Sequence, residues 1–233
     1  MFVDGFRLAM VGMNNAAPAS TSALHNLNRL DQTSRKMATG GEGIWTWLSR
    51  YWGPIPVTTG KIQDEWAPVI EYRLPGARYN GDLDLAAILD WLLSVRPRLP
   101  ESVELLSVDE ENRKQFDDAY MATDLAYQRW LAILKNRPGE HLLPLAYQAN
   151  PKDRWIGFAL ADGVLADREA AKKRGLDDRQ LYEMVLKIRP DHTEALRGLW
   201  HLSQVEGDGA MATSYRARLQ ALSPLDNELR LRH

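Results

Sequence analysis

The spacing of prolines in the C-terminal third of the chain limits what it can fold into more than any other feature. Pro190 and Pro224 lie 34 residues apart, and two stretches of helical length, Thr193–Val205 and Asp208–Leu222, fill the interval. Glu206-Gly207 separates them. A proline cannot continue a helix, because it has no N–H group and its ring clashes with the preceding turn. The spacing therefore predicts a pair of antiparallel helices between two stops.

This 34-residue unit resembles the tetratricopeptide repeat in length and layout. Small residues would let its two helices approach, and larger apolar residues would fill the gap between them. The small candidates are Gly198, Ala212 and Ala217, and the large ones are Leu196, Leu199, Trp200, Tyr215 and Leu219. The resemblance has departures: the glycine falls two positions before its usual place, and Pro151 and Pro190 are 39 residues apart. An ordinary helical hairpin is the alternative.

Helical periodicity extends over most of the remaining chain. It predicts a helix after Asn80-Gly81-Asp82, a long helix from a capping box at Ser107–Glu110 to about Lys135, and shorter helices beyond Pro138-Gly139. Strands are expected only at residues 2–11 and 67–74. The predicted fold is thus mainly α, with a small β element on the N-terminal side followed by antiparallel helical hairpins of tetratricopeptide-like type. Pro97 and Pro100 suggest two domains, a mixed α/β region 1–100 and a helical repeat-like domain 101–233.

Composition excludes several classes of function. The chain of 233 residues is 45% hydrophobic and 26% charged, which is ordinary for a folded protein. It contains no cysteine, so thiolate metal sites, disulfides and a cysteine nucleophile are ruled out. Its net charge of −2 shows none of the basic excess typical of nucleic-acid-binding domains.

The sequence contains no apolar run of the roughly 18 residues that a bilayer-spanning helix requires. Asp4 and Arg7 interrupt the apolar N-terminus, so we interpret it as a strand and not as a signal peptide. The expected location is the cytoplasm, as a free protein or as the soluble tail of a membrane protein.

One segment carries a second family resemblance. Residues 64–75 read DEWAPVIEYRLP, in which an acidic pair leads through a proline to a short apolar strand, Glu71-Tyr72 and a further proline. This segment resembles the end of the catalytic domain in long bacterial spermidine-synthase-like proteins, and residues 7–12 resemble a late strand of that domain. The likeness covers residues 2–79. The acidic pair is Asp64-Glu65 instead of two aspartates and stands one residue further from Pro68, which weakens any role carried over to Asp64.

The resemblance implies that the cofactor-binding half and the catalytic aspartate of such an enzyme would precede residue 1. On this basis we expect a non-catalytic C-terminal accessory module that uses no cofactor and contacts a protein partner or an upstream synthase-like domain. The first alternative is a stand-alone tetratricopeptide-like adaptor that grips a peptide. The second is an enzyme with an unrecognised site built from scattered carboxylates and Tyr72 or Tyr79.

Several motifs resemble parts of chemical sites, but a structural role explains each of them better. Gly40, Gly41 and Gly43 resemble a phosphate-binding turn, but the residues before them are helical in character, so a helix C-cap is expected. Asp82, Asp84 and the pair Asp177-Asp178 stand at predicted helix starts, where carboxylates act as caps. The five histidines lack the i, i+4 pairing of a helical zinc site.

The tryptophans are the remaining candidates for a contact surface. Four of them fall within 22 residues, and clustered tryptophans anchor either a core or a partner surface. Core filling is the default, and any exposed part of the cluster is the first candidate surface. The full candidate set is Trp45, Trp47, Trp52, Trp66, Trp200 and Tyr215.

Overall fold

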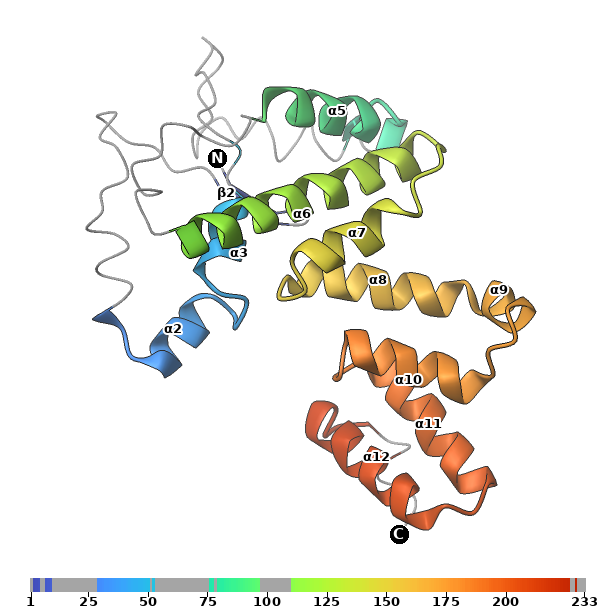
Figure 1. Ribbon diagram of the computed structural model, residues 1–233. Helices are drawn as coiled ribbons and strands as arrows, with labels where there is room; N and C mark the ends of the chain where they lie inside the picture. The colour runs from blue at the N-terminus through green and yellow to red at the C-terminus, as the bar shows by residue number, and fades with distance from the viewer. Residues whose placement is uncertain are drawn as a thin grey trace. The chain divides into compact units, whose positions relative to one another are not determined.

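A computed structural model describes residues 2–4, 7–9, 29–50, 52, 76–77, 79–96, 110–226 and 229 of the chain. The described residues are mainly helical, as predicted (Figure 1). The chain divides into two compact units, residues 1–153 and residues 154–233. The prolines near residue 100 suggested a boundary between residues 100 and 101. The packing of the helices within the first unit explains why the observed boundary lies later in the chain.

The first unit is organised around one long helix. Helix α6, Glu110–Leu134, ends within one residue of the predicted position, and it packs against α3, Ile44–Ser49, α5, Leu85–Val95, and α7, Leu142–Ala149. Because α5 and α6 share a core, Pro97 and Pro100 separate two helices of one unit and do not separate two domains. That core comprises Trp52, Leu89 and Tyr127, with Leu92, Leu93, Trp130 and Leu131 packed against it.

Helix α5 runs antiparallel to α6. Asp90, in the middle of α5, forms an ion pair with Lys135 just after the C-terminal end of α6, at 2.5 Å. Arg96, just after the C-terminal end of α5, contacts Asp124 in the middle of α6, at 3.2 Å. The Asp84 side chain caps α5 by accepting from the Ala87 N–H at 2.9 Å, which confirms the capping role expected for that carboxylate.

The N-terminal residues form two short strands instead of one. Strands β1, Phe2–Asp4, and β2, Arg7–Ala9, pair antiparallel, with Val3 opposite Leu8. The single strand expected over residues 2–11 is divided in two, because Asp4 pairs with Arg7. The strand predicted at 67–74 and the Ser107 cap lie outside the described residues.

The second unit contains five helices among its described residues. They are α8, Arg154–Ala166, α9, Arg168–Lys173, α10, Asp178–Ile188, α11, Thr193–Val205, and α12, Gly209–Leu222. The two helices predicted between Pro190 and Pro224 are thus confirmed almost to the residue. Only α9 lacked a counterpart in the sequence-based prediction. A capping box on Asp177 and Gln180 begins α10, as its carboxylate pair indicated.

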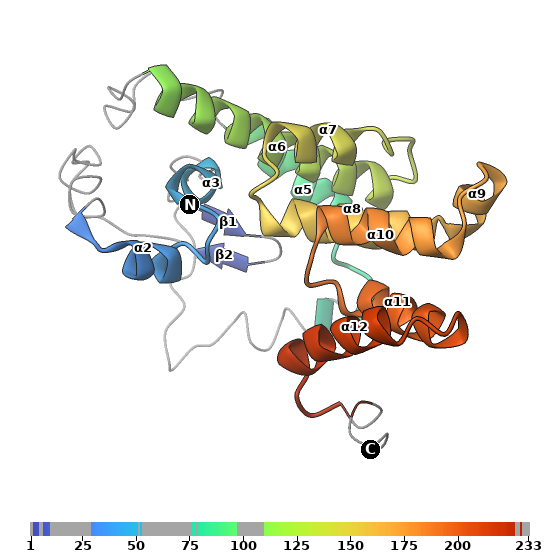
Figure 2. The same ribbon diagram turned by 60° about the horizontal axis from the view of Figure 1, so that its bottom comes forward.

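Consecutive helices of this unit pack on one another. Helix α10 contacts α8 and α11, and α11 contacts α12 as an antiparallel hairpin (Figure 2). The hairpin buries all five apolar residues predicted to fill it, and Ala212 lies beside them. Gly198 makes a different contact from the expected one: it faces the Tyr182 ring of α10, where an added Cβ would lie 2.4 Å from the ring. Ala217 is exposed and makes no such contact.

Candidate functional site

The glycine-rich turn is the cap of one helix and the start of the next. Helix α2, Gln32–Ala38, has Thr39 as its C-cap. The Gly41 N–H donates back to the Lys36 carbonyl at 2.9 Å. Gly40 and Gly41 have positive φ, which a helix C-cap favours, and Gly43, also with positive φ, is the N-cap of α3. The predicted C-cap is therefore confirmed. Since the turn follows a helix and not a strand, it lacks the setting of a phosphate-binding loop.

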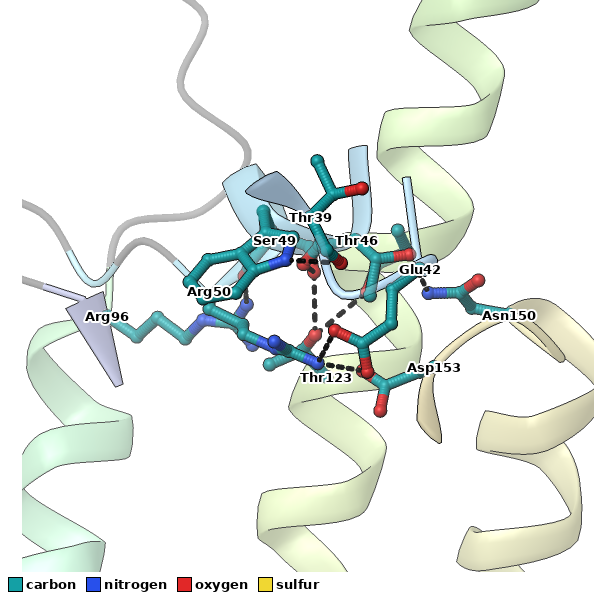
Figure 3. A network of polar contacts seen from close by, with 11 residues as sticks. Thr39, Glu42, Thr46, Ser49, Arg50, Arg96, Thr123, Asn150 and Asp153 are labelled. Carbon is teal, nitrogen blue, oxygen red and sulfur yellow. Dashed lines mark hydrogen bonds and ion pairs between the residues drawn. The ribbon is translucent and has the colours of Figure 1, made fainter. Parts of the chain in front are cut away.

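This turn places Glu42 inside the first unit, against a buried arginine. The Arg50 Nη2 lies 2.9 Å from Glu42 Oε2 and 3.4 Å from Asp153 Oδ2, and all three side chains are 5% exposed (Figure 3). Arg50 follows α3 and Asp153 follows α7, so the guanidinium joins segments about a hundred residues apart in sequence. It also lies over the Trp47 ring, 5.2 Å from the centroid.

Neutral side chains extend the contact between α3 and the other helices. Asn150 Nδ2 donates to Thr46 Oγ1 at 3.0 Å, and Ser49 Oγ lies 2.9 Å from Thr123 Oγ1 on α6 (Figure 3). Thr123 Oγ1 in turn donates to the Ala119 carbonyl within α6. Polar groups on a buried face are tolerated when each has a partner, and here they fix α3 against α6 and the end of α7.

A second arginine enters the network from the end of α5. Arg96 Nη2 donates to the Ser49 carbonyl at 2.7 Å, and its guanidinium lies 3.8 Å from the centroid of the Tyr120 ring. Burial lowers the pKa of Arg96 from its ordinary value, while the neighbouring Tyr120 and Asp124 oppose that shift. We call the set formed by Glu42, Thr46, Ser49, Arg50, Arg96, Thr123, Asn150 and Asp153 the buried polar network.

The buried polar network is suited to holding helices together. Both of its carboxylates contact Arg50, its second cation Arg96 contacts Asp124, and each of its residues is 7% exposed or less. The Ser49 hydroxyl, its one primary alcohol, is fully buried and donates to the Thr46 carbonyl at 2.6 Å. A nucleophile would need access to a substrate and a base to accept its proton, and these contacts give Ser49 neither.

The tryptophans of the candidate surface occupy different environments. Trp45 is half-buried and donates from Nε1 to Asn112 Oδ1 at 3.0 Å, while Trp47 is 37% exposed and donates to the Thr39 carbonyl. Trp52 is only 1% exposed and belongs to the core between α5 and α6. Trp66 lies outside the described residues. Trp47 is thus the member of the cluster that the structure leaves at a surface.

The two candidate residues in the second unit lie inside its core. Trp200 is 1% exposed and Tyr215 is 6% exposed, and both belong to the cluster that closes the α11–α12 hairpin. From the sequence, both residues were candidates for the gap between the helices and for a contact surface. In the structure both lie in the gap between the helices.

An exposed apolar face on α5 escaped the sequence analysis. Leu85, Ile88, Trp91 and Val95 are 50%, 42%, 52% and 44% exposed, and their spacing of three or four residues puts them on one side of the helix. Nine of the eleven residues of α5 are apolar, and that width of apolar surface is the signal that one buried face does not account for.

Histidines and carboxylates form no metal-binding group of three or more among the residues that the structure describes. His192 instead caps α11: its Nδ1 accepts from the Ala195 N–H at 3.2 Å, and its Nε2 contacts Asp162 Oδ1 at 2.9 Å. Tyr79 is 92% exposed, and Tyr72 lies outside the described residues. No helix in the described part of the chain has the length and apolarity to cross a bilayer.

Comparison with known proteins gives no relative. Neither family models, nor curated proteins, nor solved structures match this chain.

Proposed function

We propose that this chain is a non-catalytic, C-terminal accessory region of a spermidine-synthase-like protein, in which the second unit acts as a helical interaction module. The observation that carries the proposal is the packing of α8, α10, α11 and α12 in sequence order around their own apolar clusters. Helices that stack in chain order leave broad faces for contact with other proteins, which is the use such arrays commonly serve.

The acidic-proline segment at residues 64–75 supports the synthase-like part of the proposal. In the family that it resembles, this segment stands near the end of the catalytic domain, and some members carry helical repeats after that domain. The described residues that follow it here are helices α5 to α12, which agrees with an accessory region. The buried polar network fits the same role, because it joins helices and presents no exposed reactive group.

The first test is the size of the protein in its own cells. An immunoblot with an antibody raised against residues 110–226 should detect a polypeptide much larger than 26.5 kDa, because the synthase-like half would be on the same chain. A band at 26.5 kDa would contradict the proposal. The isolated chain should also show no saturable heat of binding when titrated with S-adenosyl compounds, and saturable binding would mean that it holds a cofactor site.

The 34-residue unit favours a second candidate, a free-standing adaptor that binds an extended peptide. Its helices α11 and α12 have the bounds expected for one tetratricopeptide unit, and α10 packs against them through Gly198. Panning a random peptide library on the whole chain would test it. Enrichment of a shared motif, together with a 26.5 kDa native protein, would place this function ahead of the first.

A further inference from the structure

Residues beyond α12 contact the α11–α12 hairpin again. Helix α12 ends at Leu222 with Ser223 as its C-cap, and the Asp226 N–H donates to the Ser223 carbonyl at 3.1 Å, which turns the chain. Leu229 then lies in the apolar cluster of the hairpin, where it is only 1% exposed. We call Ser223–Asp226 together with Leu229 the C-terminal strap.

Two arginines of the hairpin hold the strap. Arg197 of α11 forms a hydrogen-bonded ion pair with Asp226, whose side chain is 16% exposed. Arg216 of α12 donates from Nη2 to the Leu229 carbonyl at 2.7 Å. The strap thus presents an apolar side chain to a hydrophobic cluster, a carboxylate to a cation and a main-chain carbonyl to a donor. These are the kinds of contact with which a protein surface recognises a peptide segment.

The strap is separable from the helix that precedes it. The Ser223 N–H donates to the Leu219 carbonyl at 2.8 Å, so α12 is complete before the strap begins. Pro224 and Leu225 are exposed, the latter by 75%. Because the connection lies at the surface, Asp226 and Leu229 can leave the hairpin without unwinding α12.

The strap satisfies the hydrogen-bonding groups of Arg216 only in part. The Nε of Arg216 is buried and has no hydrogen-bond partner within the part of the chain that the structure describes, although its Nη2 binds Leu229. A buried N–H group without an acceptor lowers the stability of the state that contains it. The strap is therefore held less firmly than the hairpin allows, as a displaceable occupant is.

We propose that the surface of the α11–α12 hairpin under the strap is a peptide-binding site, which the strap of the same chain occupies. The site selects an acidic residue three positions before a leucine, the pattern of Asp226 and Leu229. This inference rests on the proposed role of the second unit as an interaction module. It adds the contact surface of that module and the segment that controls access to it.

A fluorescent peptide with the sequence of residues 222–233 tests the site on the full chain by anisotropy. Leu229→Asp places a charge in the apolar cluster and should release the chain's own strap. A tethered strap competes at an effective concentration in the millimolar range, so the unchanged chain should bind the peptide about a hundredfold more weakly than Leu229→Asp. Leu225→Asp is the matched control, because Leu225 is 75% exposed and its replacement should leave the strap in place.

A charge exchange shows whether the peptide takes the position of the strap, and it avoids any change in the apolar cluster. Arg197→Asp should repel the chain's own Asp226 and loosen the strap. A peptide carrying Asp226→Arg should bind this variant about tenfold more tightly than the unmodified peptide does, because the charges are again opposite. In the Leu229→Asp chain, which keeps Arg197, the preference between the two peptides should be the reverse.

No peptide binding to Arg197→Asp, or binding that ignores the charge at residue 226, would overturn the proposal and make the strap a fixed part of the hairpin core. Equal affinity of a folded Leu229→Asp chain and the unchanged chain would overturn it as well, because the strap would not then compete. These failures would leave the immunoblot result and the accessory-region assignment untouched. A native protein of 26.5 kDa would remove that assignment and leave the peptide-binding site in place.

Discussion

Gly198 is the point where α11 comes closest to α10. A Cβ added there would lie 2.4 Å from two ring carbons of Tyr182, much closer than two carbon atoms can approach. We expect Gly198→Ala to destabilise the fold by about 1–3 kcal/mol, the usual cost of overfilling a packed core. Urea unfolding followed by circular dichroism measures the change.

Gly163→Ala is the matched control for Gly198→Ala. Gly163 also lies inside a helix, α8, but apart from its chain neighbours and its own helix backbone no atom lies within 4 Å of its added Cβ. Alanine is the better helix former by about 1 kcal/mol, so Gly163→Ala should stabilise the chain. If Gly198→Ala stabilised the chain as Gly163→Ala should, helix propensity would outweigh the Tyr182 contact.

Arg50 is a buried cation that faces two buried carboxylates. It pairs with Glu42 and Asp153, which are both 5% exposed, and water therefore does little to solvate them when the guanidinium is removed. Arg50→Met should destabilise the first unit by about 3–5 kcal/mol, the usual cost of breaking a buried ion pair from one side. Thermal unfolding would reveal the loss as a lower midpoint.

Arg174→Met should change stability by less than about 1 kcal/mol, because the Arg174–Asp167 pair is exposed on both sides. Triple replacement of Glu42, Arg50 and Asp153 by Gln, Met and Asn should recover part of the loss caused by Arg50→Met alone. A cost of Arg50→Met no larger than that of Arg174→Met would show that the buried carboxylates do not depend on the guanidinium.

The N-terminus of α11 depends on a histidine cap. Since the Nδ1 of His192 accepts the Ala195 N–H, its Nε2 must carry the proton that is donated to Asp162. His192→Ala removes the cap and the link to α8, and should cost about 0.5–2 kcal/mol. His192→Asn keeps an acceptor for the Ala195 N–H, but its side chain is too short to reach Asp162. Its stability in urea should therefore fall between that of the unchanged chain and that of His192→Ala. Equal stability of the Ala and Asn variants would rule out capping.

The start of α10 should carry part of the acid sensitivity of the second unit. Arg168 Nε donates to Asp178 Oδ1 at 2.9 Å, and this bidentate pair lowers the pKa of the Asp178 carboxyl below its ordinary 3.8. When folding lowers the pKa of a carboxyl, the group stabilises the fold at pH values above its pKa in the unfolded chain. That contribution is lost as the pH falls through its pKa in the folded chain.

Asp178→Asn should therefore narrow the difference in urea midpoint between pH 7 and pH 3, and high salt should reduce the effect because the pair is partly exposed. An unchanged pH dependence in the variant would show that the pair contributes nothing to folding.

The helices of the second unit could be predicted from sequence because local signals determine them. Asp177 and Asp208 cap their helices, Pro190 stops one, and Gly207 has the positive φ of a helix C-cap. These signals act within a few residues, so a single sequence contains them. The capping function of the glycine turn and of Asp84 was predictable for the same reason.

The buried polar network could not be predicted, because its residues are brought together by packing. Arg50 and Asp153 are 103 residues apart in the sequence. Thr46 and Asn150 have a similar separation, and no spacing rule relates the members of either pair. The exposed side of α5 was missed for another reason: periodicity identifies one apolar face, and it does not show that a second face stays exposed.

The two ways of dividing the chain make opposite predictions about truncation. The apolar clusters of the second unit, including Leu196, Trp200 and Val185, lie wholly within residues 154–233. The fragment 154–233 should therefore fold alone, with the helical circular dichroism and single cooperative transition of a small domain.

The fragment 101–233, which starts at the boundary suggested by the prolines, keeps α6 but loses α3 and α5. It would expose the face of α6 that carries Tyr127 and Trp130, together with the Thr123 hydroxyl and the Phe116 ring that α3 covers. A patch of that size promotes association, so this longer fragment should aggregate or melt at a lower temperature than 154–233. Size-exclusion chromatography and thermal unfolding compare the two fragments directly. If 101–233 were monomeric and the more stable, α6 and α7 would belong with the C-terminal helices, and the sequence-based boundary would hold.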